Sequence, residues 1–153
     1  MSFGEDLSLQ VMLAHKSYHQ FLLKCFKDID VYQHLQVLML LNRKGGCCSQ
    51  KELRIYLQIE KSYMVNIIET LVQKGYVFKD VNFKDRRSKL ITLTAKAHSL
   101  AQNLTIQMES FTEMMSKHLT WQERHNCIRT LKLFNENFNE VADIENNPTT
   151  NNS

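Results

Sequence analysis

A change of hydrophobic period at Gly75, inside the stretch from Ser49 to Thr94, constrains the fold of this chain more than any other feature. Before Gly75, apolar residues recur every three or four positions, as they do on one face of an α-helix. After it, residues 76–80 and 89–94 have the composition of strands, and the charged segment 84–88 separates them. Glycine favours the left-handed conformation that ends many helices. The stretch therefore predicts helices followed by a two-stranded hairpin.

Two short helices are expected before Gly75. Ser49 and Glu52 have the spacing of a capping box, which would open the first helix. That helix has an apolar face formed by Leu53, Tyr56 and Leu57. Ile59-Glu60 forms the turn, and a second helix runs from about Lys61 to Lys74. Its apolar face consists of Met64, Ile67, Ile68 and Leu71, and its polar face of Tyr63, Asn66, Thr70 and Gln73.

Two helices joined by a short turn and followed by a basic hairpin form a winged helix-turn-helix. The second helix of such a unit fits the major groove of DNA, and the hairpin fits the neighbouring minor groove. Charge supports this interpretation: residues 43–96 contain 12 lysines and arginines against 5 acidic residues, whereas the whole chain has a net charge of +3. Basic charge gathered on one segment is typical of a surface that binds phosphates.

Short motifs also keep a specific order and spacing across this stretch. They are Gln50-Lys51-Glu52-Leu53, Glu60-Lys61-Ser62, Leu71 with Lys74-Gly75-Tyr76-Val77, Asp85-Arg86-Arg87 and Leu93-Thr94-Ala95-Lys96. In these motifs the chain resembles the MarR family of bacterial transcriptional regulators, and its flanking helices fit the layout of that family. The resemblance implies a DNA-binding homodimer, more often a repressor than an activator, that responds to a small-molecule effector.

The segments outside the winged helix are expected to be helical. Residues 5–28 carry an apolar stripe, residues 31–42 form a central buried helix, and Thr94 caps a helix that runs to about His118. Thr120 and Glu123 form another capping box before a last helix that ends near Val141. The first stripe consists of Leu7, Val11, Ala14, Tyr18, Phe21, Leu22 and Cys25, and the interior positions of the last helix are Ile128, Leu131, Phe134 and Phe138.

The predicted fold is mainly α with a small β-wing. Its parts are N-terminal helices for dimerisation and support (1–42), the winged helix-turn-helix (43–94), C-terminal dimerisation helices (95–141) and an Asn/Thr-rich tail expected to be disordered (142–153). The terminal helices carry more apolar surface than the winged helix can cover, which indicates an obligate interface. A twofold dimer would present its two recognition helices roughly 34 Å apart and would read a near-palindrome.

Three groups of residues are candidates for contact with double-stranded DNA. Ser49, Gln50 and Lys51 begin the first helix of the motif, where free amides and the helix dipole can hold a phosphate. The second helix presents Ser62, Tyr63, Asn66 and Thr70 to the major groove. The resembled family often has Thr-Arg where Val65-Asn66 stand here, so a relative's operator sequence does not transfer to this chain.

The wing supplies the third group. Asp85 and Arg87 match the Asp-x-Arg pattern of the family, in which the carboxylate orients the basic side chain toward the minor groove. Lys84, Arg86 and Lys89 would add contacts to the DNA backbone. An ordinary solvated hairpin turn is the alternative interpretation of these charges.

An effector pocket is a further expectation that the resemblance implies. In this family, ligands bind where the dimer helices meet the winged helix, and His15, Tyr18, Leu38 and Met108 could line that cleft. The residues themselves show no glycine-rich phosphate loop and no Gly-x-Ser-x-Gly, so neither an enzyme nor a cofactor site is expected. The six histidines lack the companions of a metal site, so no metal is expected either.

The sequence contains no membrane span and no secretory signal, so the protein is expected to stay in the cytoplasm. Two other functions remain open. One is a winged helix that serves only as a protein-interaction module. The other is redox sensing through Cys47 or Cys48, whereas Cys25 is expected to be a buried structural thiol.

Overall fold

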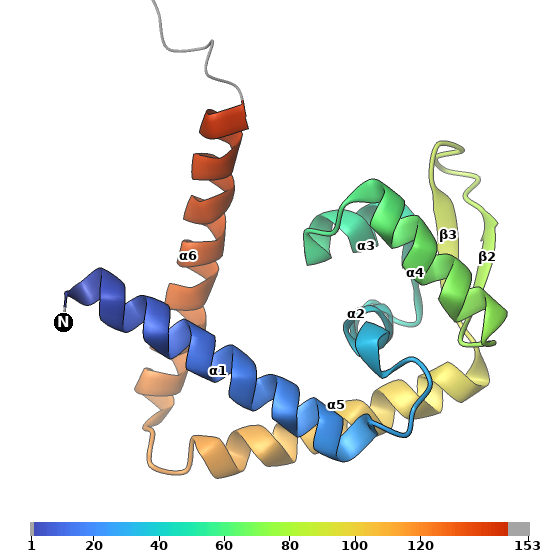
Figure 1. Ribbon diagram of the computed structural model, residues 1–153. Coiled ribbons are helices and arrows are strands. Elements are labelled where there is room, and N and C mark those ends of the chain that lie inside the picture. The colour runs from blue at the N-terminus through green and yellow to red at the C-terminus, as the bar shows by residue number, and fades with distance from the viewer. Residues whose placement is uncertain (1, 147–153) are drawn as a thin grey trace, which may run out of the picture. The chain divides into compact units, whose positions relative to one another are not determined.

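The structure is a computed structural model that describes residues 2–146, with side chains described as far as residue 138. Its elements, in chain order, are α1 (Phe3–Phe26), a 3-10 turn η1 (Tyr32–His34), α2 (Leu35–Arg43), β1 (Cys47–Ser49), α3 (Gln50–Leu57), α4 (Lys61–Gln73), β2 (Val77–Val81), β3 (Lys89–Leu93), α5 (Ala95–Met115) and α6 (Trp121–Asn146) (Figure 1). They form two compact units, which meet at Met108 and Glu109 within α5. No helix of the described chain is long and apolar enough to span a membrane.

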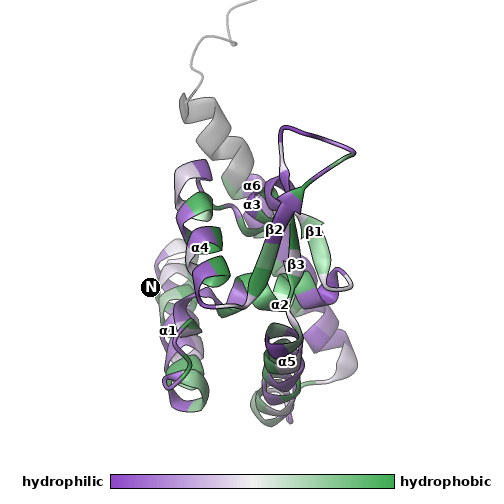
Figure 2. Ribbon diagram, turned by 90° about the vertical axis from the view of Figure 1, so that its right-hand side faces the viewer, coloured by the Kyte–Doolittle hydropathy of each residue, from purple (hydrophilic) through white to green (hydrophobic). Residues whose placement is uncertain are grey.

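The helix-turn-helix and the wing of the first unit confirm the predicted fold class. Helix α4 buries its predicted apolar face, in which Met64, Ile67, Ile68 and Leu71 are at most 3% exposed. Helix α2 lies at the centre of the core, because Leu35, Leu38 and Leu41 have no exposed surface. Figure 2 shows green on α2 and on parts of the strands, including the start of β2, with the mostly purple hairpin loop beyond the ends of β2 and β3.

The sheet has one strand more than predicted. Its antiparallel order is β1-β3-β2, so Ile91 of β3 lies between Cys48 of β1 and Lys79 of β2. Strand β1 has only three residues, too few to show an alternating pattern in the sequence. A turn in which Gly45 and Gly46 have positive φ angles leads into it, and the Gly46 carbonyl accepts a hydrogen bond from the Leu93 amide at 2.8 Å.

Tyr76 connects three parts of the first unit at the point where α4 ends. Its amide donates to the Leu71 carbonyl (2.8 Å) and the Gly75 amide donates to Val72 (3.0 Å), which is the hydrogen-bond pattern of a Schellman cap. The Tyr76 carbonyl accepts from the Thr94 amide just before α5. Its hydroxyl donates to Asp30 (2.8 Å), which follows α1. The predicted break of period at Gly75 is therefore confirmed, and Gly75 has φ +76°.

The ends of the predicted helices differ from the observed ones for local reasons. Helix α1 begins before residue 5, because Ser2 and Glu5 form a capping box that the sequence analysis missed. Residues 32–34 form a 3-10 turn, so the α-helix begins at Leu35. The prediction that Cys25 is a buried thiol at the end of the apolar stripe of α1 is wrong. Leu22 and Phe26 are buried there, whereas Cys25 is exposed.

Helix α6 corrects two further expectations. Within the second unit, the Thr120–Glu123 capping box is confirmed, and Arg124 bonds Glu113 and the Ser116 carbonyl. The supposed interior positions Ile128, Leu131 and Phe138 are 55%, 48% and 71% exposed. The helix also continues to Asn146, because residues 142–146 contain no helix breaker before Pro148. The predicted disorder is thus wrong for residues 142–146, and the rest of the tail lies outside the described residues.

We expect Gly75→Ala to lower the free energy of unfolding by about 1–2 kcal/mol, because an alanine at positive φ is strained. A Cβ at Gly75 would meet nothing within 4 Å, so the cost is conformational and not steric. Gly4→Ala is the matched control: its Cβ also meets nothing, but Gly4 lies within helix α1, where alanine is favoured. Urea unfolding at one protein concentration measures both. Equal midpoints for the two variants would contradict this role of Gly75.

Candidate nucleic-acid interface

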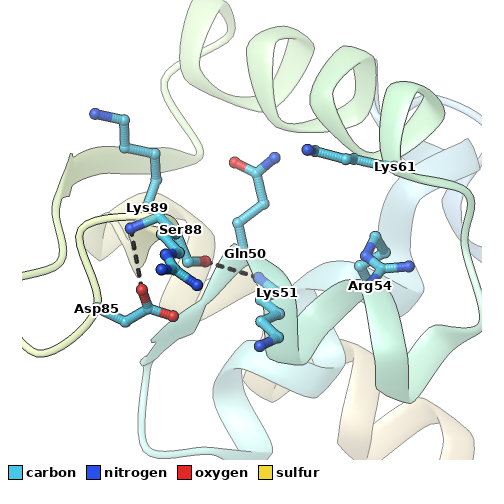
Figure 3. Close-up of a pocket in the computed structure, with 8 residues that line it drawn as sticks. Gln50, Lys51, Arg54, Lys61, Asp85, Ser88 and Lys89 are labelled. Carbon is cyan, nitrogen blue, oxygen red and sulfur yellow. Dashed lines mark hydrogen bonds between the residues drawn. The ribbon is translucent and has the colours of Figure 1, made fainter.

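A basic recess of about 410 Å³ lies where the start of α3, the start of α4 and the wing meet. Its lining contains five cationic side chains and one carboxylate; the residues are Gln50, Lys51, Arg54, Lys61, Asp85, Arg87, Ser88 and Lys89. Figure 3 shows Lys61 of α4 and Gln50 of α3 extending into the same space, opposite Asp85 and Lys89 of the wing. Side chains from three separate elements therefore concentrate positive charge in one concave place.

The start of α3 is fixed by the predicted capping box. The Glu52 amide donates to Ser49 Oγ at 3.1 Å, and the Ser49 amide donates to Glu52 Oε2 at 2.9 Å. The Ser49 amide is the main reason that the pKa of Glu52 is lowered, so this carboxylate remains a charged acceptor at neutral pH. The cap sets the direction in which Gln50, Lys51 and Arg54 leave the helix.

Ser88 ties the wing to α3, and the sequence analysis did not single it out. Its hydroxyl accepts a hydrogen bond from the Lys51 amide at 3.0 Å, and the side chain is only 8% exposed (Figure 3). The amides of Lys51 and Glu52 are thus both used within the protein. The expectation that free amides of this turn hold a phosphate is therefore wrong for the amides of Ser49 and Lys51, and any anion contact at Lys51 depends on its side chain.

The start of α4 is capped by Glu60. Its carboxylate accepts hydrogen bonds from the amides of Ser62 (2.8 Å) and Tyr63 (3.2 Å) and from the Ser62 hydroxyl. These contacts, the Ser62 hydroxyl first, hold the pKa of Glu60 below its usual value. Ser62, a predicted groove contact, therefore already has a partner inside the motif.

The exposed face of α4 leaves three of the four predicted groove residues open to solvent, including Ser62. Tyr63 is 56% exposed, and Asn66 is exposed as well. Thr70 is half-buried, and its hydroxyl donates to the Asn66 carbonyl at 2.9 Å, so it offers less to a ligand. One turn beyond Asn66, Glu69 pairs with Lys79 of β2, which joins this helix to the wing.

The tip of the wing is built by two side chains that bond to backbone amides. Asn82 Oδ1 accepts from the amides of Lys84 (3.1 Å) and Asp85 (3.4 Å). Asp85 Oδ1 accepts from the Arg87 amide at 3.0 Å. Asp85 was expected to orient the guanidinium of Arg87; among the hydrogen bonds of the described residues, it acts on the Arg87 backbone instead. Of the predicted wing cations, Arg87 and Lys89 line the recess, while Lys84 and Arg86 are exposed outside it.

Arg54 and Lys61 complete the recess but were absent from the predicted contacts. A signal for Arg54 existed, because it lies three and four residues after Lys51 and Gln50 on the same side of α3. Lys61 is the first residue of α4, and its place opposite the wing depends on the fold. A pattern along the chain does not reveal such a neighbour.

The predicted effector residues do not share one site. A second recess of about 420 Å³ includes Tyr18 in its lining, with Gln36, Met39, Leu40, Asn42, Arg43, Tyr56, Leu57 and Thr105. Leu38 is completely buried in the core and cannot touch a ligand there, and neither His15 nor Met108 lines this recess. Tyr56, expected on the apolar face of α3, is instead 54% exposed and accepts a hydrogen bond from Arg43 at 3.2 Å.

The two adjacent cysteines lie in β1, in different surroundings. Cys48 points into the core, and burial raises the pKa of its thiol to about 11, so the reactive thiolate is disfavoured. Cys47 is half-buried and accepts a hydrogen bond from the Thr92 hydroxyl at 3.3 Å. The structure therefore gives no support to Cys48 as a redox sensor.

The fold and the basic recess define a winged helix-turn-helix protein, and comparisons with known proteins show which proteins it resembles. A family model described as MarR family matches residues 32–88. HTH-type transcriptional regulator PapX of Escherichia coli is 28% identical over 94 residues, which cover 61% of this chain and 56% of PapX. The chain thus spans little more than half of that relative's length.

Solved structures of MarR proteins have a similar fold over most of this chain. A MarR transcriptional regulator from Methanosarcina mazei has a TM-score of 0.74 at 24% identity, covering 90% of this chain and 99% of the other. A mutant MarR from E. coli complexed with operator DNA has a TM-score of 0.70 at 19% identity, covering 84% of this chain and 93% of that MarR chain. Residues 32–88 are therefore similar to the MarR family, and the solved structures show that the chain has the winged helix-turn-helix fold of MarR proteins. The resemblance noted from the sequence is thereby confirmed.

We expect Ser88→Ala to speed hydrogen exchange at the Lys51 amide and to lower the free energy of unfolding by about 1 kcal/mol, because this part-buried donor loses its acceptor. Ser99→Ala, at an exposed position of α5, is the matched control. It should change neither the exchange rate of the Lys51 amide nor the free energy of unfolding. Exchange measured by NMR reports the Lys51 and Glu52 amides separately. If Lys51 exchanged at the wild-type rate in Ser88→Ala, the wing would not be held in this way.

The Glu60 cap predicts a pH dependence. Its pKa is lowered in the folded state, so its contribution to stability is fully present above the unfolded value near 4.5 and is lost as pH falls through the folded value. Wild type should therefore lose its advantage over Glu60→Gln as the pH is lowered below 4.5. Urea unfolding of both proteins between neutral and acidic pH measures this difference. A difference that stays constant with pH would rule out the capping role.

Proposed function

We propose that this chain is a homodimeric transcriptional regulator that binds double-stranded DNA through the basic recess, α4 and the wing. The observation that carries the proposal is the gathering of Lys51, Arg54, Lys61, Arg87 and Lys89 around a single carboxylate. Cations drawn from three elements into one recess favour an extended polyanion, because a DNA backbone presents a row of phosphates. The carboxylate, Asp85, already bonds a backbone amide of the wing.

The three elements divide the work of binding. Lys51, Arg54 and Lys61 would contact phosphates beside the major groove, and Arg87 with Arg86 would reach the minor groove. Exposed Tyr63 and Asn66 would read base edges, since an asparagine amide can pair with N6 and N7 of adenine. Ser62 and Thr70 would contribute less, because their hydroxyls already donate within the protein.

Exposed apolar side chains support the homodimer. They lie on the three helices that were expected to pair, and include Val11 and Met12 of α1, Ile106, Met114 and Met115 of α5, and Trp121, Ile128, Leu131 and Phe138 of α6. Several of these side chains are more than half exposed in the single chain, which favours burial against a partner. Twofold pairing would present two copies of α4 to a near-palindromic operator.

Regulation by a small molecule would use the recess beside Tyr18, which lies close to the α2–α3 region of the core. An effector bound there would favour a dimer geometry that does not fit the operator, and would thereby relieve repression. The competing function is a winged helix that binds only protein. The concentration of cations in the recess argues against it, and the dependence of binding on salt separates the two functions.

We expect Arg87→Ala to weaken binding to a labelled random-sequence duplex library about tenfold at low salt, because it removes a charged contact to DNA. The slope of log affinity against log salt should become shallower by about 0.9. Lys132→Ala, an exposed lysine of α6 outside the recess, is the matched control and should leave both unchanged. Fluorescence anisotropy across a salt series measures affinity and slope together. Wild-type binding that is absent, or that ignores salt, would contradict the proposed function.

A further inference from the structure

Phe83 is the most exposed large apolar side chain among residues 2–138. It is 86% exposed and lies at the tip of the wing, after the end of β2. The other strongly exposed phenylalanines, Phe3 and Phe138, lie on helices that carry further exposed apolar residues and are expected to pair. Phe83 belongs to no such helix, so the dimer interface does not account for it.

The turn holds Phe83 in place. Asn82 Oδ1 accepts hydrogen bonds from the amides of Lys84 and Asp85, the two residues that follow Phe83. Asp85 then fixes the Arg87 amide. Side-chain acceptors therefore shape the backbone around Phe83, and the ring is presented on an ordered turn. A presented apolar group loses little conformational freedom when it binds a partner.

Positive charge surrounds this apolar tip. Lys84, Arg86 and Arg87 follow Phe83 within four residues, and the one carboxylate of residues 82–88, Asp85, accepts the Arg87 amide. This arrangement is complementary to a groove of DNA: the surrounding cations can contact the phosphates at the edges of the groove, and the apolar ring can contact the stacked bases at its floor. The minor groove accepts apolar wedges between base steps in this way.

We propose that Phe83 is a wedge that inserts at a base step of the minor groove and helps to select the flanks of the operator. This inference rests on the proposed DNA binding and adds a specificity-determining residue to it. Partial unstacking costs least at pyrimidine–purine steps, TA and CA/TG, which are easily kinked. The wedge therefore selects those steps beneath the wing, outside the bases that α4 reads.

Selection of bound duplexes from a random library tests the wedge, with wild type, Phe83→Ala and Phe78→Ala in parallel. Phe78 is the matched control, because it is also an exposed phenylalanine of the wing (58%) but lies within β2, away from the tip. Wild type and Phe78→Ala should recover the same half-sites with pyrimidine–purine steps at the flanks. Phe83→Ala should keep the half-sites, lose the flank preference and bind the wild-type site about tenfold more weakly.

A fluorescent base gives a second, direct readout. With 2-aminopurine at the selected flank step, wild type should raise the fluorescence because the base is unstacked, and Phe83→Ala should not. Unchanged flanks and unchanged fluorescence in Phe83→Ala would overturn the wedge while leaving DNA binding intact. A library from which wild type enriches nothing would instead overturn the DNA-binding function, and the wedge with it.

Discussion

The hydrogen bond between the Tyr76 hydroxyl and the Asp30 carboxylate (2.8 Å) anchors the C-terminal end of helix α4. Burial, followed by this contact, raises the pKa of Tyr76 to about 12, and the same hydrogen bond is the main reason that the pKa of Asp30 is lowered. Donor and acceptor therefore keep their roles throughout the physiological pH range. Lys74 pairs with Asp30, and Lys96 lies over the Tyr76 ring at 4.0 Å. The end of α4 is thus held to the segment after α1 and to the start of α5.

Two further links leave the winged helix little internal freedom. Ser88 joins the wing to α3, and the pair of Glu69 and Lys79 joins α4 to β2. With the end of α4 also held at Tyr76, the recess, the recognition helix and the wing form one ordered surface. A regulatory ligand that alters DNA binding would then move this surface as a body, and would not need to rearrange contacts inside it. Asp30 is well placed to transmit such a movement, because it lies in the short turn between α1 and the 3-10 turn η1.

The sequence predicted the features of this fold that are written in local spacing. The capping boxes at Ser49 and Thr120, the buried face of α4 and the turn at Gly75 each depend on residues a few positions apart. The hydrogen bond from Lys51 to Ser88 crosses 37 residues, and no local pattern reports it. The apolar face of α6 was recognised, but periodicity identifies a face and not what covers it. Exposed Ile128 and Phe138 were therefore mistaken for an interior.

Charge and base recognition lie on different residues of the proposed interface. The exposed groove residues of α4, Ser62, Tyr63 and Asn66, are neutral, whereas the cations belong to the wing, to α3 and to the start of α4. An arginine at the position of Asn66 could serve both purposes with a single side chain. In the proposed complex the phosphate contacts would supply the part of the affinity that falls with salt, and the neutral side chains would supply the preference for sequence. Salt should therefore change how tightly the protein binds DNA much more than which sequence it prefers.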